Sequence, residues 1–282
     1  MTFPRQKIID GKSIAKHVLD ELKAEIATFP RQPNLTAILV GDDPASQIYV
    51  NMKQKRASEI GIRTNVIRLP KDTTQDRLHD VIQELNLASE VDGILLQLPL
   101  PQHLDANLAI SLINPEKDVD GLNYINSGKL HMGLRGFNPC TPLGVIELLE
   151  RSQVNIEGSD AVVVGRSNLV GKPLARLLEQ KNATVTLCHS KTKNLKHYTR
   201  FADIVVSAVG KPNTITADMV KDGCVVIDVG ITRTPSGLKG DVDFDMVVLK
   251  ASKITPVPGG VGPMTIAMLM KNTVEAYKGR VL

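Results

Sequence analysis

The first hundred residues alternate between amphipathic stretches and stretches that are almost wholly apolar. Residues 12–28 repeat apolar side chains about every four positions, which predicts a helix with one apolar face. Apolar runs predict buried strands at 35–40, 64–69 and 91–98, and the segments between them predict helices at 43–60 and 73–88, with a further short helix from Asp105. Strands and helices in this alternating order predict an α/β fold, with a parallel sheet covered by helices.

Residues 114–142 interrupt this pattern, because they are rich in proline and glycine and show little periodicity. A loop-rich segment of this length is typical of a functional region or a domain junction, and we expect the boundary near Pro139. Beyond it, strands are predicted at 161–164, 184–188, 204–207 and 225–229, with helices at 143–151 and from about residues 171, 193 and 217. A possible edge strand at 239–244, a turn-rich loop at 254–263 and a helix at 265–277 follow. This second half predicts a Rossmann-like, doubly wound parallel sheet.

The clearest strand–turn–helix signal is AVVVGRSNLVGKPLAR at 161–176. An apolar strand ends at Gly165, and Gly171 and Pro173 open an amphipathic helix. Free backbone N–H groups and the positive end of a helix dipole at such a turn suit a nucleotide pyrophosphate. The spacing differs from GxGxxG, so an ordinary turn of an αβ unit remains an alternative on this motif alone.

The strand after this turn ends in CHSKT at 188–192, which contains no acidic residue. NAD sites usually place a carboxylate there to accept a hydrogen bond from the ribose 2′-OH. Arg166, Ser190 and Lys191 suit a 2′-phosphate instead, and the sequence therefore favours NADP over NAD. The alternative is that these three are solvated loop residues. Ser207 and residues 229–231, at the ends of later strands, would flank the nucleotide.

A second group of chemical residues is expected at the carboxyl edge of the first sheet. Tyr49 and Lys53 are spaced i, i+4 and share one face of the predicted helix at 43–60. Gln97 ends the third strand and faces the same edge, so it could hydrogen-bond the lysine. An acid–base or electrostatic pair is one interpretation, and a solvated helix face is the other.

Asp118 and Asp120 alternate in PEKDVDG at 115–121, but the spacing of a calcium loop is absent. A single carboxylate can instead accept two N–H donors from a heterocycle such as an amino-pyrimidinone. The six histidines show neither metal-ligand nor catalytic-triad spacing. We therefore expect no metal.

Composition and charge narrow the possible partners. The formal net charge of +4 is spread along the chain, so neither a nucleic acid nor a membrane surface is indicated as a partner. The three cysteines are far apart, which fits neither a disulfide framework nor a zinc site. The start of the sequence has no apolar targeting core, and no apolar run approaches the length of a membrane span. We expect a cytoplasmic protein.

Six motifs in order resemble the bifunctional methylenetetrahydrofolate dehydrogenase / methenyltetrahydrofolate cyclohydrolase family. They are YVNMKQK at 49–55, GILLQLPLP at 93–101, PEKDVDG at 115–121, PCTP at 139–142, GRSNLVGKP at 165–173 and PVPGGVGPM at 256–264. The resemblance implies oxidation of 5,10-methylenetetrahydrofolate with NADP and hydrolysis of the methenyl product to 10-formyltetrahydrofolate. It also implies two αβ domains around a cleft and a homodimer. The first domain would cover residues 1–138, with the helix at 265–282 packing back on it, and the NADP-binding domain residues 139–264.

The resemblance also assigns roles to individual residues. Lys53 would be the key catalytic group, with Tyr49 positioning the substrate and Gln97 tuning the lysine. The folate would contact Asp120, Pro258 and Gly259, and the dinucleotide would contact Gly165, Arg166, Ser167, Ser190 and Ile231. Thr214 and Thr232 depart from residues common in the family but lie outside the six motifs. Two alternatives stay open: a nucleotide-binding regulator without turnover, and a dehydrogenase without the cyclohydrolase step.

Overall fold

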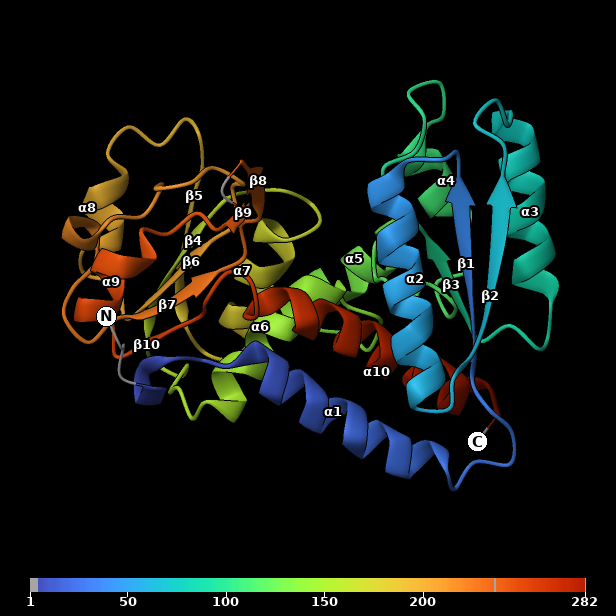
Figure 1. The fold of residues 1–282 in the computed structure, drawn as a ribbon, viewed down its shortest axis with the longest axis horizontal. Helices are drawn as coiled ribbons and strands as arrows, with labels where there is room; N and C mark the ends of the chain where they lie inside the picture. Colours follow the sequence, from blue (N-terminus) through green and yellow to red (C-terminus); the bar gives the residue numbers. More distant parts are fainter. Residues whose placement is uncertain (1–4, 236, 282) are drawn as a thin grey trace. The chain divides into compact units, whose positions relative to one another are not determined.

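The structure, a computed structural model, describes residues 5–235 and 237–281, which divide by their contacts into two units (Figure 1). One, here called the three-stranded unit, contains His17–Cys140 and the chain from Ile266 onward. The other, the five-stranded unit, contains the described residues up to Lys16 and Thr141–Thr265. Both are built on parallel sheets, which confirms the predicted α/β class.

The three-stranded unit has a parallel sheet with the strand order β2-β1-β3. Its elements are α1 (Gly11–Ile26, which starts in the other unit), β1 (Asn34–Val40), α2 (Pro44–Glu59), β2 (Arg63–Leu69), α3 (Gln75–Leu87), β3 (Gly93–Leu96), α4 (Ala106–Leu112), α5 (Tyr124–Met132) and most of α10 (Val261–Val281). Since β2 and β3 flank β1 on opposite sides, right-handed crossovers place α2 and α3 on opposite faces of the sheet.

The alternation of side chains along β1 explains how this sheet is covered. Ile38 and Val40 point to one face, where they pack with Ile82 of α3 and Ile110 of α4 in a buried apolar cluster. The intervening apolar residues of β1 are also buried and point to the opposite face. A strand buried on both faces reads as a continuous apolar run, which is why residues 35–40 were recognisable as a strand.

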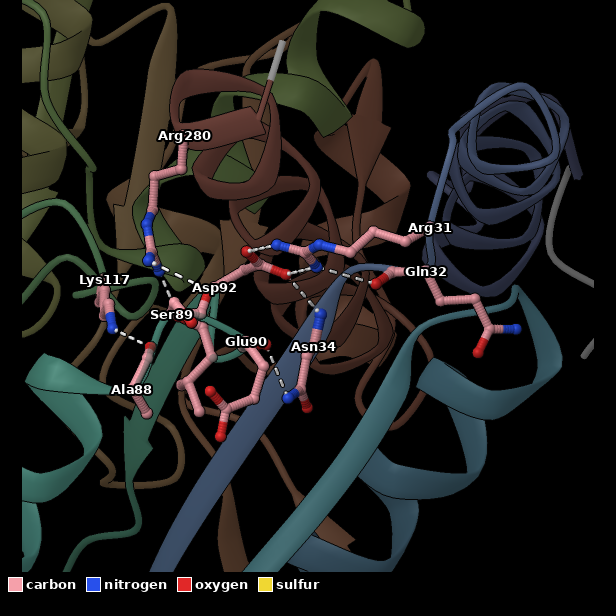
Figure 2. A network of polar contacts seen from close by, with 10 residues as sticks. Arg31, Gln32, Asn34, Ala88, Ser89, Glu90, Asp92, Lys117 and Arg280 are labelled. Carbon is pink, nitrogen blue, oxygen red and sulfur yellow. Dashed lines mark hydrogen bonds and ion pairs between the residues drawn. The ribbon is translucent and has the colours of Figure 1, made fainter.

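A polar network lies at the amino ends of β1 and β3 (Figure 2). The Arg31 guanidinium donates to both carboxylate oxygens of Asp92, each at 2.7 Å, and the buried Asp92 also accepts from the Asn34 backbone N–H at 2.8 Å. Arg280 of α10 donates to the backbone carbonyls of Val91 and Ser89. The network therefore attaches the last turn of α10 to the segment that leads into β3.

Lys117 is the buried cation beside this network, with 2% of its surface exposed. Its ammonium donates to three backbone carbonyls at the end of α3, those of Leu85, Asn86 and Ala88, at 2.7–2.8 Å. Burial lowers the pKa of Lys117 to about 8, and the positive charge of Arg280 adds to the decrease. The side chain thus caps helix carbonyls that have no partner within the helix.

The five-stranded unit has a parallel sheet with the order β10-β7-β6-β4-β5. Its elements are η1 (Arg5–Lys7), α6 (Cys140–Arg151), β4 (Asp160–Val164), α7 (Gly171–Gln180), β5 (Thr184–Cys188), α8 (Leu195–Thr199), β6 (Ile204–Ser207), η2 (Ala217–Met219), β7 (Val225–Asp228), β8 (Thr232–Thr234), β9 (Gly237–Lys239), α9 (Phe244–Lys250) and β10 (Lys253–Ile254). The sheet order matches a doubly wound fold that reverses direction between β4 and β6. Ile8 forms a parallel bridge with Ile254, which attaches the start of the chain to this sheet.

Several predicted elements of this unit and of the junction are wrong. Residues 239–244 do not form an edge strand: β8 and β9 form an antiparallel hairpin, and α9 begins at Phe244. Val242 and Phe244 alternate as in a strand, but the Asp241 and Val242 N–H groups donate to the Asp228 carboxylate. The helix expected from residue 217 is a three-residue 3-10 turn.

The segment 114–142 also contains a helix that the prediction missed, α5. The Asn123 side chain caps its start by accepting from the Ile125 N–H, and Gly133 ends it in the left-handed conformation at φ 70°. Its only buried residues are Asn126 and Leu130, so no apolar periodicity marks it in the sequence. Within residues 5–235 and 237–281, no helix has both the length and the apolar character to cross a membrane.

Candidate functional site

The predicted pair of Lys53 and Gln97 is in direct contact in the three-stranded unit. The Lys53 ammonium on α2 donates to Gln97 Oε1 at 3.0 Å, and Gln97, which follows β3, is 8% exposed. Gln97 Nε2 donates in turn to the Leu98 carbonyl at 2.6 Å. This second bond fixes the orientation of the amide, so that its oxygen is the atom that faces the lysine.

The start of α2 determines where Lys53 and Tyr49 lie. Asp43 caps the helix by accepting from the Ser46 N–H at 2.7 Å, and this bond holds the pKa of the exposed Asp43 carboxyl below its usual value. Pro44 occupies the first turn, as the sequence predicts. Tyr49 lies one helical turn before Lys53, and 48% of its surface is exposed. A half-exposed aromatic ring next to a hydrogen-bonded lysine is available to a planar ligand.

Asp120 reaches the same end of the sheet because the residues before it pair with β3. The Ile94 N–H donates to the Lys117 carbonyl at 2.8 Å, and Ile94 and Asp118 form a parallel bridge. Because parallel segments advance together, this register brings Asp120 level with the end of β3, where Gln97 follows. Asp120 is half-buried.

The structure separates the two aspartates of this motif. Asp118 is 1% exposed and accepts from the backbone N–H groups of Leu122 and Asn123 and from Asn126 Nδ2. Burial raises the pKa of Asp118 to about 6 against the effect of these hydrogen bonds. Asp118 is buried and its three bonds hold its own loop, so Asp118 shapes the loop, and the half-buried Asp120 is the carboxylate available to a ligand.

Two residues that the sequence analysis missed, Cys140 and Asn272, hold the backbone directly before Asp120, and Asn272 also holds Asn138, which lies beside Gly121. Asn272 Nδ2 donates to the carbonyls of Val119 and Asn138, at 2.8 and 3.1 Å, and the Cys140 thiol donates to Val119 at 3.4 Å. Burial raises the pKa of Cys140, the charge of Asp120 adds to the rise and Lys53 opposes it. Lys53 and Asp120 therefore both lie near the buried Cys140 thiol. No periodic signal in the sequence marks these contacts, and those of Asn272 join residues more than a hundred positions apart.

In the five-stranded unit, the loops after β4 and β5 leave the sheet side by side. Val164 pairs with Cys188, and the Gly165 N–H donates to the Cys188 carbonyl at 2.9 Å. Gly165 has φ 123°, and a Cβ there would lie 2.4 Å from the Ala208 carbonyl oxygen, so the position requires glycine. Arg166 directly follows Gly165, and Ser190 lies two residues after Cys188. Both side chains are exposed.

Both loops are held by their own hydrogen bonds. The Ser167 hydroxyl accepts from the N–H groups of Val170 and Gly171 at the start of α7, at 3.1 and 3.4 Å. In the other loop, the Thr192 hydroxyl accepts from the His189 N–H at 2.9 Å. The Ser190 and Lys191 side chains are exposed beside it, with no acid in the turn. This donor set fits a phosphate better than a ribose hydroxyl.

The remaining predicted residues belong to the five-stranded unit as well. Ile231 follows β7 and is 47% exposed. Pro258 is exposed, and the Gly259 carbonyl accepts from the Lys12 N–H at 3.1 Å. The structure thus groups Tyr49, Lys53, Gln97 and Asp120 in one unit, and Pro258 and Gly259 with the predicted cofactor residues in the other. Among the described residues, no cluster of three or more His, Cys, Asp or Glu side chains could hold a metal ion.

Comparisons with known proteins agree with this grouping of the predicted site residues. Residues 9–120 match the catalytic domain of the tetrahydrofolate dehydrogenase/cyclohydrolase family, and residues 139–281 match its NAD(P)-binding domain. The chain is 56% identical over 277 residues to the bifunctional protein FolD of Halothermothrix orenii, covering 96% of this chain and 98% of that protein.

Two solved structures are similar over nearly the whole chain. The crystal structure of the bifunctional enzyme FolD from Campylobacter jejuni, a methylenetetrahydrofolate dehydrogenase/cyclohydrolase, has a TM-score of 0.95 at 49% identity, and covers 97% of this chain and 99% of that one. The corresponding enzyme of Trypanosoma brucei, solved with NADP cofactor and inhibitor, has a TM-score of 0.92 at 42% identity, and covers 97% of this chain and 98% of that one.

Proposed function

Because the chain belongs to the tetrahydrofolate dehydrogenase/cyclohydrolase family, we propose that Lys53, Gln97 and Asp120 are its folate-side functional groups. The predicted family and the two predicted activities are confirmed by the bifunctional relatives. The chain is an enzyme that oxidises 5,10-methylenetetrahydrofolate to the 5,10-methenyl cation and then hydrolyses the cation to 10-formyltetrahydrofolate. The two alternatives, a nucleotide-binding regulator without turnover and a dehydrogenase without the cyclohydrolase step, are not favoured.

The two steps make different demands on the protein. NADP, when bound, accepts the hydride that leaves the one-carbon unit, so the first step requires orientation of the folate. In the second step, water adds to the cationic carbon, one carbon–nitrogen bond breaks, and one proton is released. That step requires a group that takes a proton from water.

The single observation that supports our assignment best is the bond from Lys53 Nζ to Gln97 Oε1 at 3.0 Å. A lysine amine that has given up its proton can take a proton from the attacking water, becomes an ammonium, and then passes this proton to solvent. Gln97, oriented by the Leu98 carbonyl, keeps Nζ in one place during this exchange. Tyr49, one turn away, presents a ring face on which the substrate can stack.

We place the pterin ring at Asp120, because this half-buried carboxylate can accept two N–H donors, whereas Asp118 already accepts three hydrogen bonds from its own loop. Pro258 and Gly259 are proposed to contact the folate from the five-stranded unit. Their support is the match of the PVPGGVGPM motif at 256–264 to the family.

NADP is the proposed cofactor, as in the Trypanosoma brucei structure. Gly165 lets the chain pass close to Ala208 after β4, and Ser167 orders the turn at the start of α7, which is the turn proposed to face the pyrophosphate. Arg166 and Ser190 are exposed at the ends of β4 and β5, where a 2′-phosphate would bind. Ile231 offers an exposed apolar surface to the dinucleotide.

The assignment of Lys53 is tested with Lys53→Met, which preserves the length of the side chain and removes its amine. Methenyltetrahydrofolate decay should be lost, while the melting temperature stays close to that of the parent protein. Lys55→Met is the matched control, since Lys55 is an exposed lysine on the same helix. Normal 10-formyltetrahydrofolate formation by Lys53→Met would contradict the proposal.

We also infer a homodimer and a cytoplasmic location. The dimer is supported by the family resemblance, and sedimentation at micromolar concentration would test it. The location is supported by Cys140, Cys188 and Cys224, which are free and buried, as is usual in a reducing compartment.

A further inference from the structure

Two buried carboxylates lie at the carboxyl ends of β6 and β7, outside the residues assigned above. Asp241 is fully buried. One of its oxygens accepts from the Ser207 hydroxyl at 2.9 Å and the Val209 N–H at 2.7 Å, and the other accepts from the Lys211 N–H at 2.8 Å. Asp241 therefore holds the whole loop that follows β6.

Asp228, at the end of β7, is 4% exposed and holds the next loop in the same way. Its carboxylate accepts from the N–H groups of Gly230, Asp241 and Val242, at 3.1, 2.9 and 2.9 Å. The hydrogen bond from the Asp241 N–H to the Asp228 carboxylate links these two residues, which are here called the aspartate pair. The loops after β6 and β7 are thus fixed to one another through these two side chains.

The packing around the aspartate pair leaves no space for other groups. A Cβ at Gly230 would lie 2.0 Å from the Asp241 carboxylate, and one at Gly240 would lie 1.9 Å from that of Asp228. The contacts named above are all hydrogen bonds that the carboxylates accept. Buried acceptors with this many donors fix the backbone more firmly than neutral side chains do.

The place of the aspartate pair in the sheet indicates what it positions. In a doubly wound sheet the pyrophosphate lies at the first strand–helix turn, and the adenosine ribose lies near the end of the second strand. These are the ends of β4 and β5 in this chain. Since the sheet order reverses between β4 and β6, the other half of a dinucleotide extends toward β6 and β7. Ile231 comes directly after Gly230, whose N–H is bound by Asp228.

We propose that Asp241 and Asp228 are positioning residues for the nicotinamide half of the cofactor, acting through the loops at 207–211 and 229–231. This inference rests on the proposed function, because it takes NADP as the ligand. Ser207, which the sequence placed beside the nucleotide, acts in this arrangement as a donor to Asp241.

The test compares Asp241→Asn with the parent protein, because an amide replaces one acceptor oxygen by a donor that faces N–H groups. Calorimetry measures the affinity for NADP and for adenosine 2′,5′-bisphosphate, which contains only the adenosine half. The affinity for NADP, the kcat of the dehydrogenase, or both should fall by between about 10- and 100-fold. Binding of the bisphosphate and hydrolysis of methenyltetrahydrofolate, which needs no cofactor, should stay within about twofold. Asp245→Asn, an exposed carboxylate on α9, is the control.

Loss of bisphosphate binding or of cyclohydrolase activity in step with the dehydrogenase would overturn the proposal, since it would indicate a general structural role. Unchanged NADP affinity and dehydrogenase kcat would overturn it as well. If Asp241→Asn does not fold, Ser207→Ala removes a single donor and carries the same prediction at about threefold. A parent protein that fails to oxidise methylenetetrahydrofolate would refute the proposed function instead, so the two failures are distinguishable.

Discussion

Replacing Lys117 with methionine separates a structural role from a substrate-binding role within the motif at 115–121. Lys117 lies in a motif that the family resemblance connects with folate, yet its ammonium is buried and donates to three backbone carbonyls at the end of α3. Methionine has a similar volume and no charge. We expect Lys117→Met to reduce stability and to leave the KM for the folate unchanged.

The magnitude follows from the three bonds. Hydrogen bonds from a charged donor contribute about 1.5–3 kcal/mol each, and buried carbonyls that lose a partner are costly. The net loss of stability is smaller than the sum of the three bonds, because folding of the variant no longer removes an ammonium from water, which costs several kcal/mol. We expect a net loss of about 3 kcal/mol, which corresponds to a decrease of about 10 °C in melting temperature for a unit of this size.

Calorimetric unfolding and steady-state kinetics on the same preparations provide the measurement. Lys23→Met, at an exposed lysine of α1 in the three-stranded unit, controls for the loss of one positive charge. Asp120→Asn is the converse variant: its melting temperature should stay within about 2 °C and its KM for the folate should rise about tenfold or more.

The reasoning fails if Lys117→Met melts within about 2 °C of the parent protein, because the three bonds would then contribute little. It also fails if Lys117→Met raises the KM for the folate as much as Asp120→Asn does. The first result would mean that the lysine does not stabilise the end of α3, and the second that it acts on the ligand.

Three further predictions concern other parts of the chain. Arg166→Ala should weaken NADP about tenfold and NAD less than twofold by calorimetry, and equal losses would exclude a 2′-phosphate contact. Burial raises the pKa of both Asp118 and Asp228 to about 6, so the folded state keeps these protons at a higher pH than the unfolded chain does. The free energy of unfolding should therefore fall by about 3 kcal/mol per carboxyl as the pH rises from about 4 to about 6, and carbon-13 NMR midpoints below about pH 5 would contradict this. Asn272→Leu, which removes the support beside Asp120, should raise the KM for the folate and leave NADP affinity unchanged, and an unchanged KM would refute that role.

The sequence was informative where a local pattern coincides with a chemical requirement. Lys53 and Tyr49 share a helix face because of their spacing, and Gln97 ends an apolar strand, so their common edge was predictable. The parallel sheet of the five-stranded unit follows from the alternation of strands and helices, whereas its strand order does not. The errors lie where periodicity is weak: α5, with two buried residues, was missed, and the helix expected from residue 217 is η2, with three residues in all.

Contacts between residues distant in sequence could not be predicted in the same way. Asn272 supports the loop at Asp120 from more than 150 positions away, and Asp241 binds a loop that begins at Ser207. No composition, charge pattern or spacing distinguishes these two residues from other polar residues of the chain. Only the three-dimensional arrangement shows that each is surrounded by the groups that it binds.

The aspartates of this chain show why the number of hydrogen-bond donors around a carboxylate predicts its role better than its motif does. Asp118, Asp228 and Asp241 each accept three or more hydrogen bonds from the protein, and each is almost wholly buried. A carboxylate in that state has no lone pair directed at solvent, so it can act on a ligand only through the loop that it fixes. Asp120 is half-buried and close to Cys140, and Asn272 holds Val119, which precedes it, and Asn138, which lies beside Gly121. Within one motif, Asp118 therefore gives the loop its shape and Asp120 remains available for the substrate.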